Sequence, residues 1–484
     1  MAKFIDNSRP FDVHRWSDHS ESNIFVNKIY DEYFRWNNPI LTKKHLKVVL
    51  LDLYVCWNED PNQQIGILLG SNAYKAKSRY NELHISKHVI EVVHYLNQFN
   101  LIEMKIGWRD ETGRSFATRI WAAEELIKLF KEAKFGIQDI SQHKDRETII
   151  LRDSNKKDLE YDDTEKTKRM RNDLGSYNEL LHKTFIDIPE YDKPKIKLEE
   201  KKRRKRSKPV YVTISSHDKF IRRIFNNSNW NDGGRFYGGW WQRVDGKHRK
   251  GIRFNNTPTV EIDYSSLHVI LAYAHVGIDY WESTDKDPYD IPVRGVNNPE
   301  HIRDIAKSFF LLSFNASDKK ALYKAFRSEL DYDKYPYSFP DEVLEELLQN
   351  IKQTHPKVAH MICSGAGLIL MNMDSRIAEY IIRDFVKTDT PILTVHDSFI
   401  VPIGEEDRLD NLMKDAFNEV TKKNKVKVKF NKNMTLKGIN QFKFSTGPDR
   451  EYYLNSMNFI AEGNPTKGYL SRWNNHKSCF KFNI

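Results

Sequence analysis

The stretch Thr257-Pro-Thr-Val-Glu-Ile-Asp-Tyr-Ser-Ser-Leu-His268 joins a strand pattern directly to a helix pattern. Val260 and Ile262 alternate with polar residues, which predicts a β-strand that leads into Asp263. After the aspartate, apolar residues recur at helical spacing, at Leu267, Ile270, Leu271 and Ala274. Asp263 is therefore expected at the point where a strand turns into a helix.

A second stretch, Pro391-Ile-Leu-Thr-Val-His-Asp-Ser-Phe-Ile-Val-Pro402, is apolar on both sides of a His-Asp pair. This pattern predicts a β-hairpin with His396 and Asp397 at or near its tip. Aspartates are common in turns, so either stretch alone would favour a purely structural interpretation. Together, two strands that each end in a carboxylate can bring Asp263 and Asp397 onto the same divalent ions. In-line phosphoryl displacement with two metals requires such an arrangement.

The composition is that of a globular protein with an excess of basic residues. The chain has 484 residues, of which 39% are hydrophobic and 30% charged, so we expect two or three domains. No apolar run reaches membrane-spanning length. The three cysteines lie far apart, which fits a reducing cytoplasm and gives no zinc-site spacing. The net charge of +10 indicates a polyanionic partner.

Residues 41–135 show a pattern of helices followed by a β-hairpin. We predict three helices, of which the second covers Ala73 to Asn81 and the third Ser86 to Asn97. Strands at 101–106 and 116–121 flank a turn. This order is the outline of a winged helix-turn-helix in which the third helix reads DNA. Basic residues of the wing would contact phosphates, namely Lys105, Arg109, Arg114 and Arg119. A winged helix used for protein contacts is the alternative.

The segments on either side of this region are less regular. Residues 1–40 are expected to form an N-terminal arm or short helices. Residues 136–208 form a connecting region with a basic helix candidate at Lys166 to Leu181, and a basic run occupies 197–208. Such a run is usually a solvated linker, and tracking of phosphates or nuclear localisation are the other interpretations.

Two further elements carry cations close to the aspartate stretches. Upstream, Asn231-Asp-Gly-Gly-Arg-Phe-Tyr-Gly-Gly-Trp-Trp241 is rich in glycine, so its backbone can approach a nucleic-acid strand and Arg235 can contact it. Between the aspartates, Asn298 and Pro299 predict the start of a helix. On this helix Arg303 and Lys307 are four residues apart and share a face, which suits binding of a triphosphate.

In this order the elements resemble the palm shared by family A DNA polymerases and bacteriophage-type single-subunit RNA polymerases. Asp263 matches motif A, Arg303 with Lys307 matches motif B, and Asp397 matches motif C. The stretch from Asn231 to Trp241 resembles the Asp-x-x-Gly-Arg-x-Tyr element of the RNA polymerases and the Gly-Arg-Leu element of family A. Residues 41–135 are similar to the winged helices of plasmid and phage replication initiators.

The resemblance implies an α+β fold. A right-hand polymerase palm and fingers would occupy residues 209–448, after a mostly helical winged-helix domain and a connecting, thumb-like region. Residues 449–484 would be a C-terminal tail.

The resemblance also implies roles for individual residues. Asp263 and Asp397, with the main-chain carbonyl of Tyr264, would bind two Mg²⁺ ions, for which Mn²⁺ can substitute. Lys307 would act on the pyrophosphate leaving group as the third catalytic residue. The incoming nucleotide is expected to contact Arg303, His268, Leu311, Asn315 and Tyr264, and the nucleic acid Arg235, Tyr237 and His396.

The sequence departs from both families at the positions that select the sugar. His268 stands where family A has a Glu that excludes ribose, and Leu311, or Phe310 if the register shifts, stands where it has an aromatic residue. Asn315 stands where the RNA polymerases use Tyr. The form His-Asp-Ser-Phe is closer to motif C of the RNA polymerases.

The expected function is template-directed DNA synthesis by a nucleotidyltransferase that excludes ribonucleotides weakly. It would serve replication or primer synthesis of a phage, plasmid or other mobile element, in the cytoplasm of a bacterial host or of a virus-infected cell. A single-subunit RNA polymerase or primase is one alternative, and a catalytically inactive DNA-binding replication initiator is another. The expected partners are DNA template and primer, dNTPs together with NTPs, and a small accessory replication protein, with no membrane.

Overall fold

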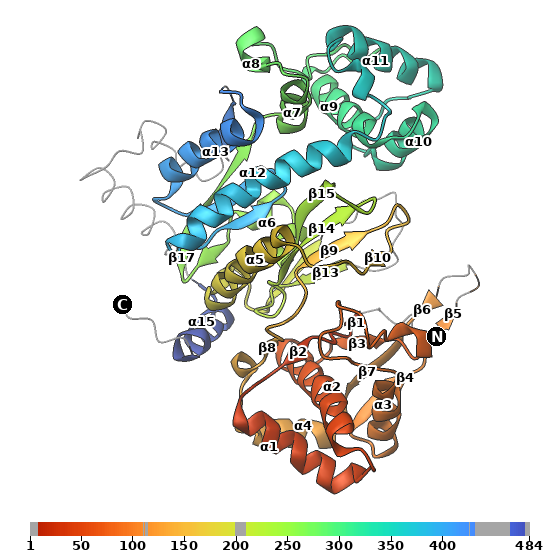
Figure 1. The fold of residues 1–484 in the computed structure, drawn as a ribbon, viewed down its shortest axis with the longest axis vertical. Coiled ribbons are helices and arrows are strands. Elements are labelled where there is room, and N and C mark those ends of the chain that lie inside the picture. The colour runs from red at the N-terminus through yellow and green to blue at the C-terminus, as the bar shows by residue number, and fades with distance from the viewer. Residues whose placement is uncertain are drawn as a thin grey trace. The chain divides into compact units, whose positions relative to one another are not determined.

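The computed structural model describes residues 8–109, 111, 115–198, 210–424, 426–430 and 465–479. The chain forms two compact units, which are described separately here (Figure 1). Unit 1 comprises residues 1–148, 215–220 and 474–484, and unit 2 comprises residues 149–214 and 221–473. Both units mix helices with small sheets, as expected of an α+β protein.

Unit 1 contains a four-stranded sheet and four α-helices around one hydrophobic core. The strand order is β1-β3-β7-β4, with β1 (Ser8–Pro10), β3 (Gln64–Ile67), β7 (Thr118–Ala122) and β4 (Ile102–Lys105). The helices are α1 (Ser20–Ile29), α2 (Pro39–Glu59), α3 (His88–Gln98) and α4 (Glu124–Glu132). Two-stranded ladders join β2 (Arg15–Trp16) to β8 (Ser141–Gln142) and β5 (Trp108–Arg109) to β6 (Ser115–Phe116). Asn38 starts α2 by accepting a hydrogen bond from the Leu41 N–H at 3.1 Å.

The predicted third helix and β-hairpin are present in unit 1. Helix α3 covers His88–Gln98, and strands β4 and β7 pair with Lys105 opposite Arg119. The predicted helix from Ala73 to Asn81 is wrong, because only a short 3₁₀ turn, Ser71–Ala73, forms there. The Asn81 side chain instead holds a turn, since its amide donates to the Ile85 carbonyl at 2.8 Å and its oxygen accepts from the Ile85 N–H at 2.9 Å.

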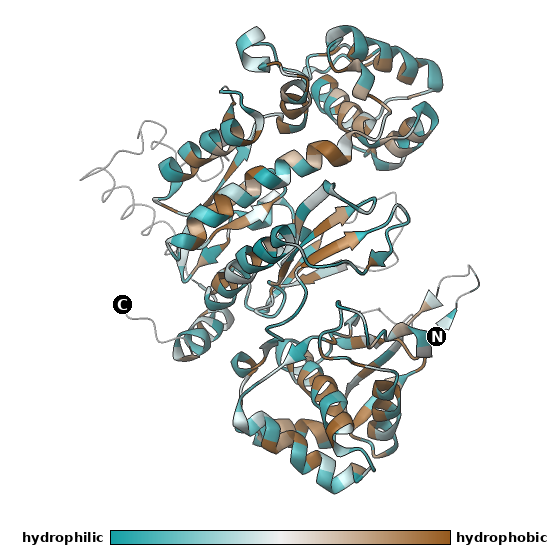
Figure 2. Cartoon of the chain, viewed as in Figure 1, coloured by the Kyte–Doolittle hydropathy of each residue, from teal (hydrophilic) through white to brown (hydrophobic). Residues whose placement is uncertain are grey.

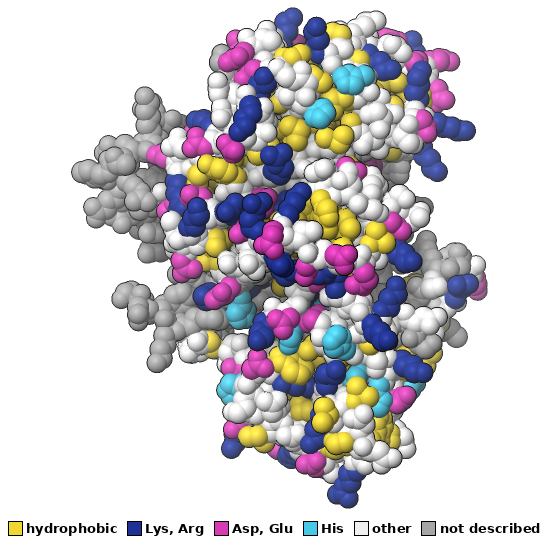
Figure 3. Space-filling view, in the orientation of Figure 1, with side chains coloured by type: hydrophobic (Ala, Val, Ile, Leu, Met, Phe, Trp, Pro, Cys, Tyr) yellow, Lys and Arg dark blue, Asp and Glu magenta, His cyan; other side chains and the backbone are white. Residues whose placement is uncertain are grey.

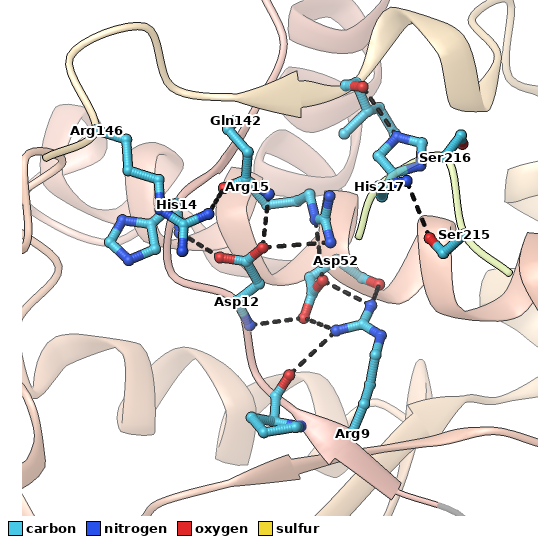
Figure 4. A network of polar contacts seen from close by, with 12 residues as sticks. Arg9, Asp12, His14, Arg15, Asp52, Gln142, Arg146, Ser215, Ser216 and His217 are labelled. Atoms are coloured by element: carbon cyan, nitrogen blue, oxygen red, sulfur yellow. Dashed lines mark hydrogen bonds and ion pairs between the residues drawn. The ribbon is translucent and has the colours of Figure 1, made fainter. Parts of the chain in front are cut away.

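The N-terminal residues that the structure describes, from Ser8 on, belong to unit 1 and include a short helix, α1. Strand β1 pairs with β3, and Phe25, Val26 and Ile29 of α1 are buried in the core. A network of ion pairs fastens this segment to α2 (Figure 4). Its centre is the fully buried Asp52, whose carboxylate lies 2.7 Å from Arg9 and 3.3 Å from Arg15.

Residues 215–220 complete unit 1 although they follow 66 residues of unit 2 in the chain, residues 149–214. The Ser215 hydroxyl donates to the Glu59 carboxylate at the end of α2. The His217 ring forms a hydrogen bond of 3.0 Å with the Ile140 carbonyl (Figure 4), and Lys219 is buried.

Unit 2 contains two larger sheets. One has the order β10-β9-β14-β15, with β10 (Asp158–Leu159), β9 (Ile149–Arg152), β14 (Ile221–Asn226) and β15 (Asn229–Gly238). The other has the order β11-β16-β17-β19-β18, and β20 also pairs with β17. Its strands are β11 (Ile186–Asp187), β16 (Arg253–Phe254), β17 (Thr257–Tyr264), β19 (Ser398–Pro402), β18 (Leu393–Val395) and β20 (Val428–Phe430). A separate ladder joins β12 (Lys195–Leu198) to β13 (Val210–Thr213).

The helices of unit 2 share one core with these sheets, and Figure 2 shows hydrophobic residues along β9 and β14. Helix α12 (Gly367–Lys387) contacts β15, α5 (Glu165–Lys183), α7 (Leu267–His275) and α13 (Glu406–Thr421). The others are α6 (Gly246–Arg249), α8 (Tyr280–Ser283), α9 (Pro299–Asn315), α10 (Lys319–Glu329) and α11 (Asp341–Thr354). Helix α9 begins as predicted, because the Asn298 side chain accepts from the N–H groups of Glu300 and His301 at 3.0 and 3.3 Å.

Two predicted segments fall largely outside the described residues. Most of the basic run at 197–208 lies there, as does most of the expected tail. The described part of that tail contains helix α15 (Lys467–Cys479), whose residues up to Trp473 belong to unit 2. There Tyr469 is buried, and Arg472 forms an ion pair of 2.7 Å with Asp187. Among the described helices, none is both long and apolar enough to cross a membrane.

Candidate active site

Strands β17 and β19 bring the two predicted aspartates to neighbouring positions. Asp263 is opposite Ser398 in the antiparallel ladder, and Asp397 is the residue before Ser398. The Tyr264 N–H donates to the Asp397 carbonyl at 3.4 Å, which joins the backbones next to both acids. The predicted hairpin is present, because Val395 pairs with Ser398 and leaves only His396 and Asp397 in the turn.

The turn that carries Asp397 is held in a defined conformation. His396 has a φ of +58°, the left-handed value that a two-residue hairpin turn requires at its first position. The Ser398 hydroxyl donates to Glu261 at 2.6 Å, and Glu261 forms an ion pair of 2.9 Å with Arg249. A strand residue and a cation thus fix the end of the hairpin, and sequence reasoning found neither Glu261 nor Arg249.

The donor set at the two strand ends fits a hard divalent cation. Asp397 has no hydrogen bond or ion pair to its carboxylate among the residues that the structure describes. No group of three or more His, Cys, Asp or Glu side chains that could hold a metal occurs in the described part of the chain. Mg²⁺ nevertheless commonly uses one or two carboxylates and takes its other oxygens from water and substrate phosphates. Asp263, Asp397 and the Tyr264 carbonyl offer oxygen donors of this kind.

Arg235 links the glycine-rich strand β15 to α7 and to α12. Its Nε donates to the Asp374 carboxylate at 2.6 Å, and its terminal nitrogen lies 2.8 Å from Nε2 of His268. A guanidinium can only donate, so Nε2 of His268 must accept and the ring is neutral. Burial and the charge of Arg235 accordingly lower the pKa of His268 to about 4. Asp374 was missed by the sequence reasoning, because α12 carries several other polar and charged residues and nothing in the sequence marks Asp374 as the buried one.

The two cations of α9 lie beside the buried ring of Tyr289. The Arg303 guanidinium is 5.4 Å from the ring centroid and the Lys307 ammonium is 5.9 Å from it. Arg303 also donates to Asp287 at 2.7 Å, whereas Lys307 has no ion pair among the described residues. The positive charge of Lys307 contributes to the lowered pKa of His268, which places both groups in one electrostatic cluster. Sequence reasoning missed Asp287 and Tyr289.

The positions expected to select the sugar follow Lys307 on the same helix. Leu311 is half-buried, and the Asn315 side chain donates to the Leu311 carbonyl at 3.1 Å. Phe310 and Phe314 are buried in the core and stack with ring centroids 5.0 Å apart. The alternative register with Phe310 at the sugar position is therefore wrong, because this ring points into the protein.

The other residues expected to bind nucleic acid have different surroundings. Tyr237 on β15 and His396 lie with ring centroids 6.4 Å apart, and the buried Tyr264 side chain donates to the Met413 carbonyl at 2.5 Å.

In unit 1, Arg109 is exposed and Lys105 is half-buried. Arg119 is only 3% exposed, so the prediction that it contacts phosphate is not compatible with its position. Arg114 lies outside the described residues.

Comparisons with known proteins give little information about this chain. No protein-family model matches it, and no curated protein does. One similar solved structure is described as the POL domain of Pol1 from M. smegmatis in complex with DNA primer-template and dNTP. It has 13% sequence identity and a TM-score of 0.26, and the match covers 84% of this chain and 66% of the other. A likeness of that extent is too weak to indicate a function for this chain.

Proposed function

We propose that the chain is a template-directed nucleic-acid polymerase that adds nucleotides to a 3′-hydroxyl. The observation that carries the proposal is the pairing of β17 with β19, which sets Asp263 beside the turn that holds Asp397. Asp397, Arg235 and Lys307 lie in one electrostatic cluster, and Arg303 is one turn from Lys307 on α9. Two adjacent acids with cations of this kind suit a reaction between a triphosphate and a hydroxyl group.

The proposed role of each side chain follows from the hydrogen bonds and ion pairs that it forms. Asp263 and Asp397 would hold Mg²⁺, which supplies charge neutralisation of the phosphates and activation of the attacking hydroxyl when bound. Arg303 is already oriented by Asp287 at 2.7 Å and would hold the outer phosphates. Lys307, with no described ion pair, would donate a proton to the departing pyrophosphate or stabilise its negative charge. The Tyr264 carbonyl remains the proposed third metal donor.

His268 supports weak selection between sugars. The Arg235 guanidinium occupies its Nε2, so Nδ1 carries the proton and is left as a donor. The neutral His268 ring can donate a hydrogen bond to a 2′-hydroxyl, which would accept a ribonucleotide, or it can crowd the 2′-carbon, which would exclude one. Leu311 and Asn315, one and two turns after Lys307, would complete this pocket. This arrangement favours an RNA polymerase or primase as the second candidate function.

Unit 1 is proposed to bind DNA, with α3 as the reading helix and Arg109 on the wing as a phosphate contact. The order α2, β3, α3, β4, β7 supports a winged helix, and a protein-contact role is the alternative. Replacement of Arg109 by Gln should lower the slope of log affinity against log salt by about 1. Lys128→Gln is the matched control, because Lys128 is exposed and already paired with Glu125 at 3.0 Å. Equal slopes for both variants would favour the protein-contact role.

One experiment tests the polymerase proposal directly. The full chain is incubated with primed and unprimed DNA templates and Mg²⁺ or Mn²⁺, with dNTPs and NTPs supplied separately. Extension of the primer with dNTPs is the expected result, and products from NTPs on unprimed template would support the primase. If neither substrate is incorporated with either metal while DNA still binds, the chain would be a DNA-binding replication initiator. The placement in a phage, plasmid or other mobile element, and a small accessory partner, are part of the same proposal.

A further inference from the structure

Helices α5 and α12 contact each other in unit 2 and carry a cluster of cations. Lys166 and Arg169 lie on α5, Arg376 and Arg383 lie on α12, and all four are exposed. Figure 3 shows Lys and Arg side chains gathered over these two helices. Neither the metal site nor the sugar pocket uses any of these residues.

The carboxylates near this cluster are already engaged. Glu379 forms an ion pair of 3.0 Å with the buried Arg223, which also donates to the Gly234 carbonyl at 2.8 Å. Asp173 forms an ion pair of 3.4 Å with Arg383. Lys166, Arg169 and Arg376 therefore remain without an ion pair among the described residues.

The like charges lie close enough to affect one another. Burial and then the charges of Arg223, Arg376 and Arg169 lower the pKa of Lys166, although Glu379 acts in the opposite direction. Crowding of cations without counterions destabilises the free protein, so an anionic ligand with several charges would bind favourably here. A nucleic-acid strand offers one phosphate per 3.4 Å or so of its length.

The cluster lies on a different side of α12 from the candidate active site. Asp374, which faces Arg235, and Arg376 are two residues apart, and residues at that spacing do not share a helical face. A strand bound at Arg376 would thus be held apart from the carboxylates that act on the 3′-hydroxyl.

We propose that Lys166, Arg169 and Arg376 form a second binding site for the phosphodiester backbone of a nucleic-acid strand, on the outer side of α5 and α12. The identity of the ligand rests on the proposed polymerase function. The site holds a part of the strand away from the reacting end and adds affinity that does not depend on base sequence.

The test measures binding of a short labelled single-stranded oligodeoxynucleotide to the full chain over a series of salt concentrations, with EDTA and without nucleotides. The variant combines Lys166→Gln, Arg169→Gln and Arg376→Gln. Loss of three phosphate contacts should reduce the slope of log affinity against log salt by about 2 and weaken binding at low salt about tenfold.

The matched control removes the same number of positive charges, all of them from α5, at residues that are paired. It combines Lys168→Gln, Arg171→Gln and Lys183→Gln, whose ion pairs with Glu165, Asp163 and Glu179 measure 3.0, 2.7 and 2.7 Å. Only a small change in slope is expected, and an equal change in both triple variants would overturn the proposal. The charge-preserving variant Lys166→Arg, Arg169→Lys, Arg376→Lys should retain affinity, which separates loss of charge from misfolding.

The assay contains no nucleotide, so its outcome is independent of polymerisation. A cluster that binds the strand in a chain that extends no primer would support this site and overturn the polymerase. A chain that extends primers but binds the strand equally well in all variants would support the polymerase and overturn this second binding site.

Discussion

Two clusters of charged side chains, one in each unit, differ in how fully their charges are paired. In unit 1, the buried carboxylate of Asp52 is surrounded by Arg9 at 2.7 Å, Arg15 at 3.3 Å and the Asp12 N–H at 3.1 Å (Figure 4). In unit 2, Asp397 and Lys307 lie in one electrostatic cluster and neither has an ion pair among the described residues.

This difference in pairing separates charges that stabilise the fold from charges that remain available to bind a ligand. A buried carboxylate is tolerated only if cations and hydrogen-bond donors compensate for its lost hydration, so each partner in unit 1 depends on the others. An accessible carboxylate or ammonium without a partner keeps its capacity for a metal or a phosphate. Substitutions in the two clusters should therefore affect different measurements.

The largest expected effect is on catalysis, at the two aspartates of unit 2. Asp397→Ala should reduce nucleotide incorporation by about a thousandfold or more, roughly 4 kcal/mol, because it removes a proposed metal donor. Asp263→Ala should behave alike, and neither should change the thermal unfolding temperature much. Asp389→Asn in the loop before β18 is the control, since Asp389 is exposed and lies outside the cluster. Near-normal incorporation by Asp397→Ala would contradict the palm assignment.

The paired cluster should show the opposite behaviour. Asp52→Ala leaves Arg9 and Arg15 without their carboxylate and should lower the free energy of unfolding of unit 1 by about 3 kcal/mol. The measurement is chemical denaturation followed by a probe in unit 1, with the exposed Asp31→Ala as control. Unchanged stability would mean that the network does not hold the N-terminal segment.

Lys307→Ala should have a smaller effect on catalysis than loss of either aspartate. We expect the turnover number to fall about a hundredfold, with less change in the apparent KM for the nucleotide, because the ammonium acts on the leaving group. Arg303→Ala should instead mainly raise the KM. Single-turnover kinetics distinguish an effect on the chemical step from an effect on nucleotide binding. A rise in KM for Lys307→Ala and a fall in turnover for Arg303→Ala would mean that Arg303 acts on the leaving group and Lys307 binds the triphosphate.

The unit 1 network should also make stability depend on pH. Burial opposes ionisation of Asp12, but the charges of Arg15 and Arg146 outweigh it and hold the pKa of that carboxyl well below its usual range. A carboxyl group whose pKa is lowered by folding stabilises the folded state at pH values above its pKa in the unfolded chain, about 3.9. This stabilisation is lost as the pH falls toward the lower pKa of the folded state. Denaturation at pH values from about 6 to 3 should show this decline, and Asp12→Asn should flatten it.

The smallest expected effect is discrimination between sugars. With His268 neutral and held by Arg235, competition between dNTP and NTP at equal concentration should favour dNTP by much less than about a thousandfold, roughly 4 kcal/mol. Stronger discrimination would show that His268 excludes ribose by steric contact. Preference for NTP would move the chain to the RNA polymerase interpretation.

Local sequence patterns predicted the helices and strands of the candidate site, but they did not predict contacts between residues that are far apart in the sequence. The strand before Asp263, the hairpin around Asp397 and the start of α9 each depend on residues within one short window. Asp374 reaches Arg235 across 139 positions of sequence, and no periodicity indicates such a pair. The predicted helix at Ala73 failed for a local reason, because the Asn81 side chain donates to the Lys75 carbonyl at 3.2 Å and so competes for a backbone group of that stretch. Where each charge finds its partner depends on tertiary packing.

The segment at 215–220 has a consequence for synthesis of the chain. Unit 1 includes these residues as well as residues 474–484, so a nascent chain that has reached residue 148 lacks both later segments. At about 5–20 residues per second, the missing 72 residues (149 to 220) need roughly 4 to 14 s more to be translated. During that time Glu59 lacks Ser215 and His217, its partners in the folded unit. A ribosome stalled before residue 215 should therefore carry a unit 1 that proteases cleave more readily than the same unit after release.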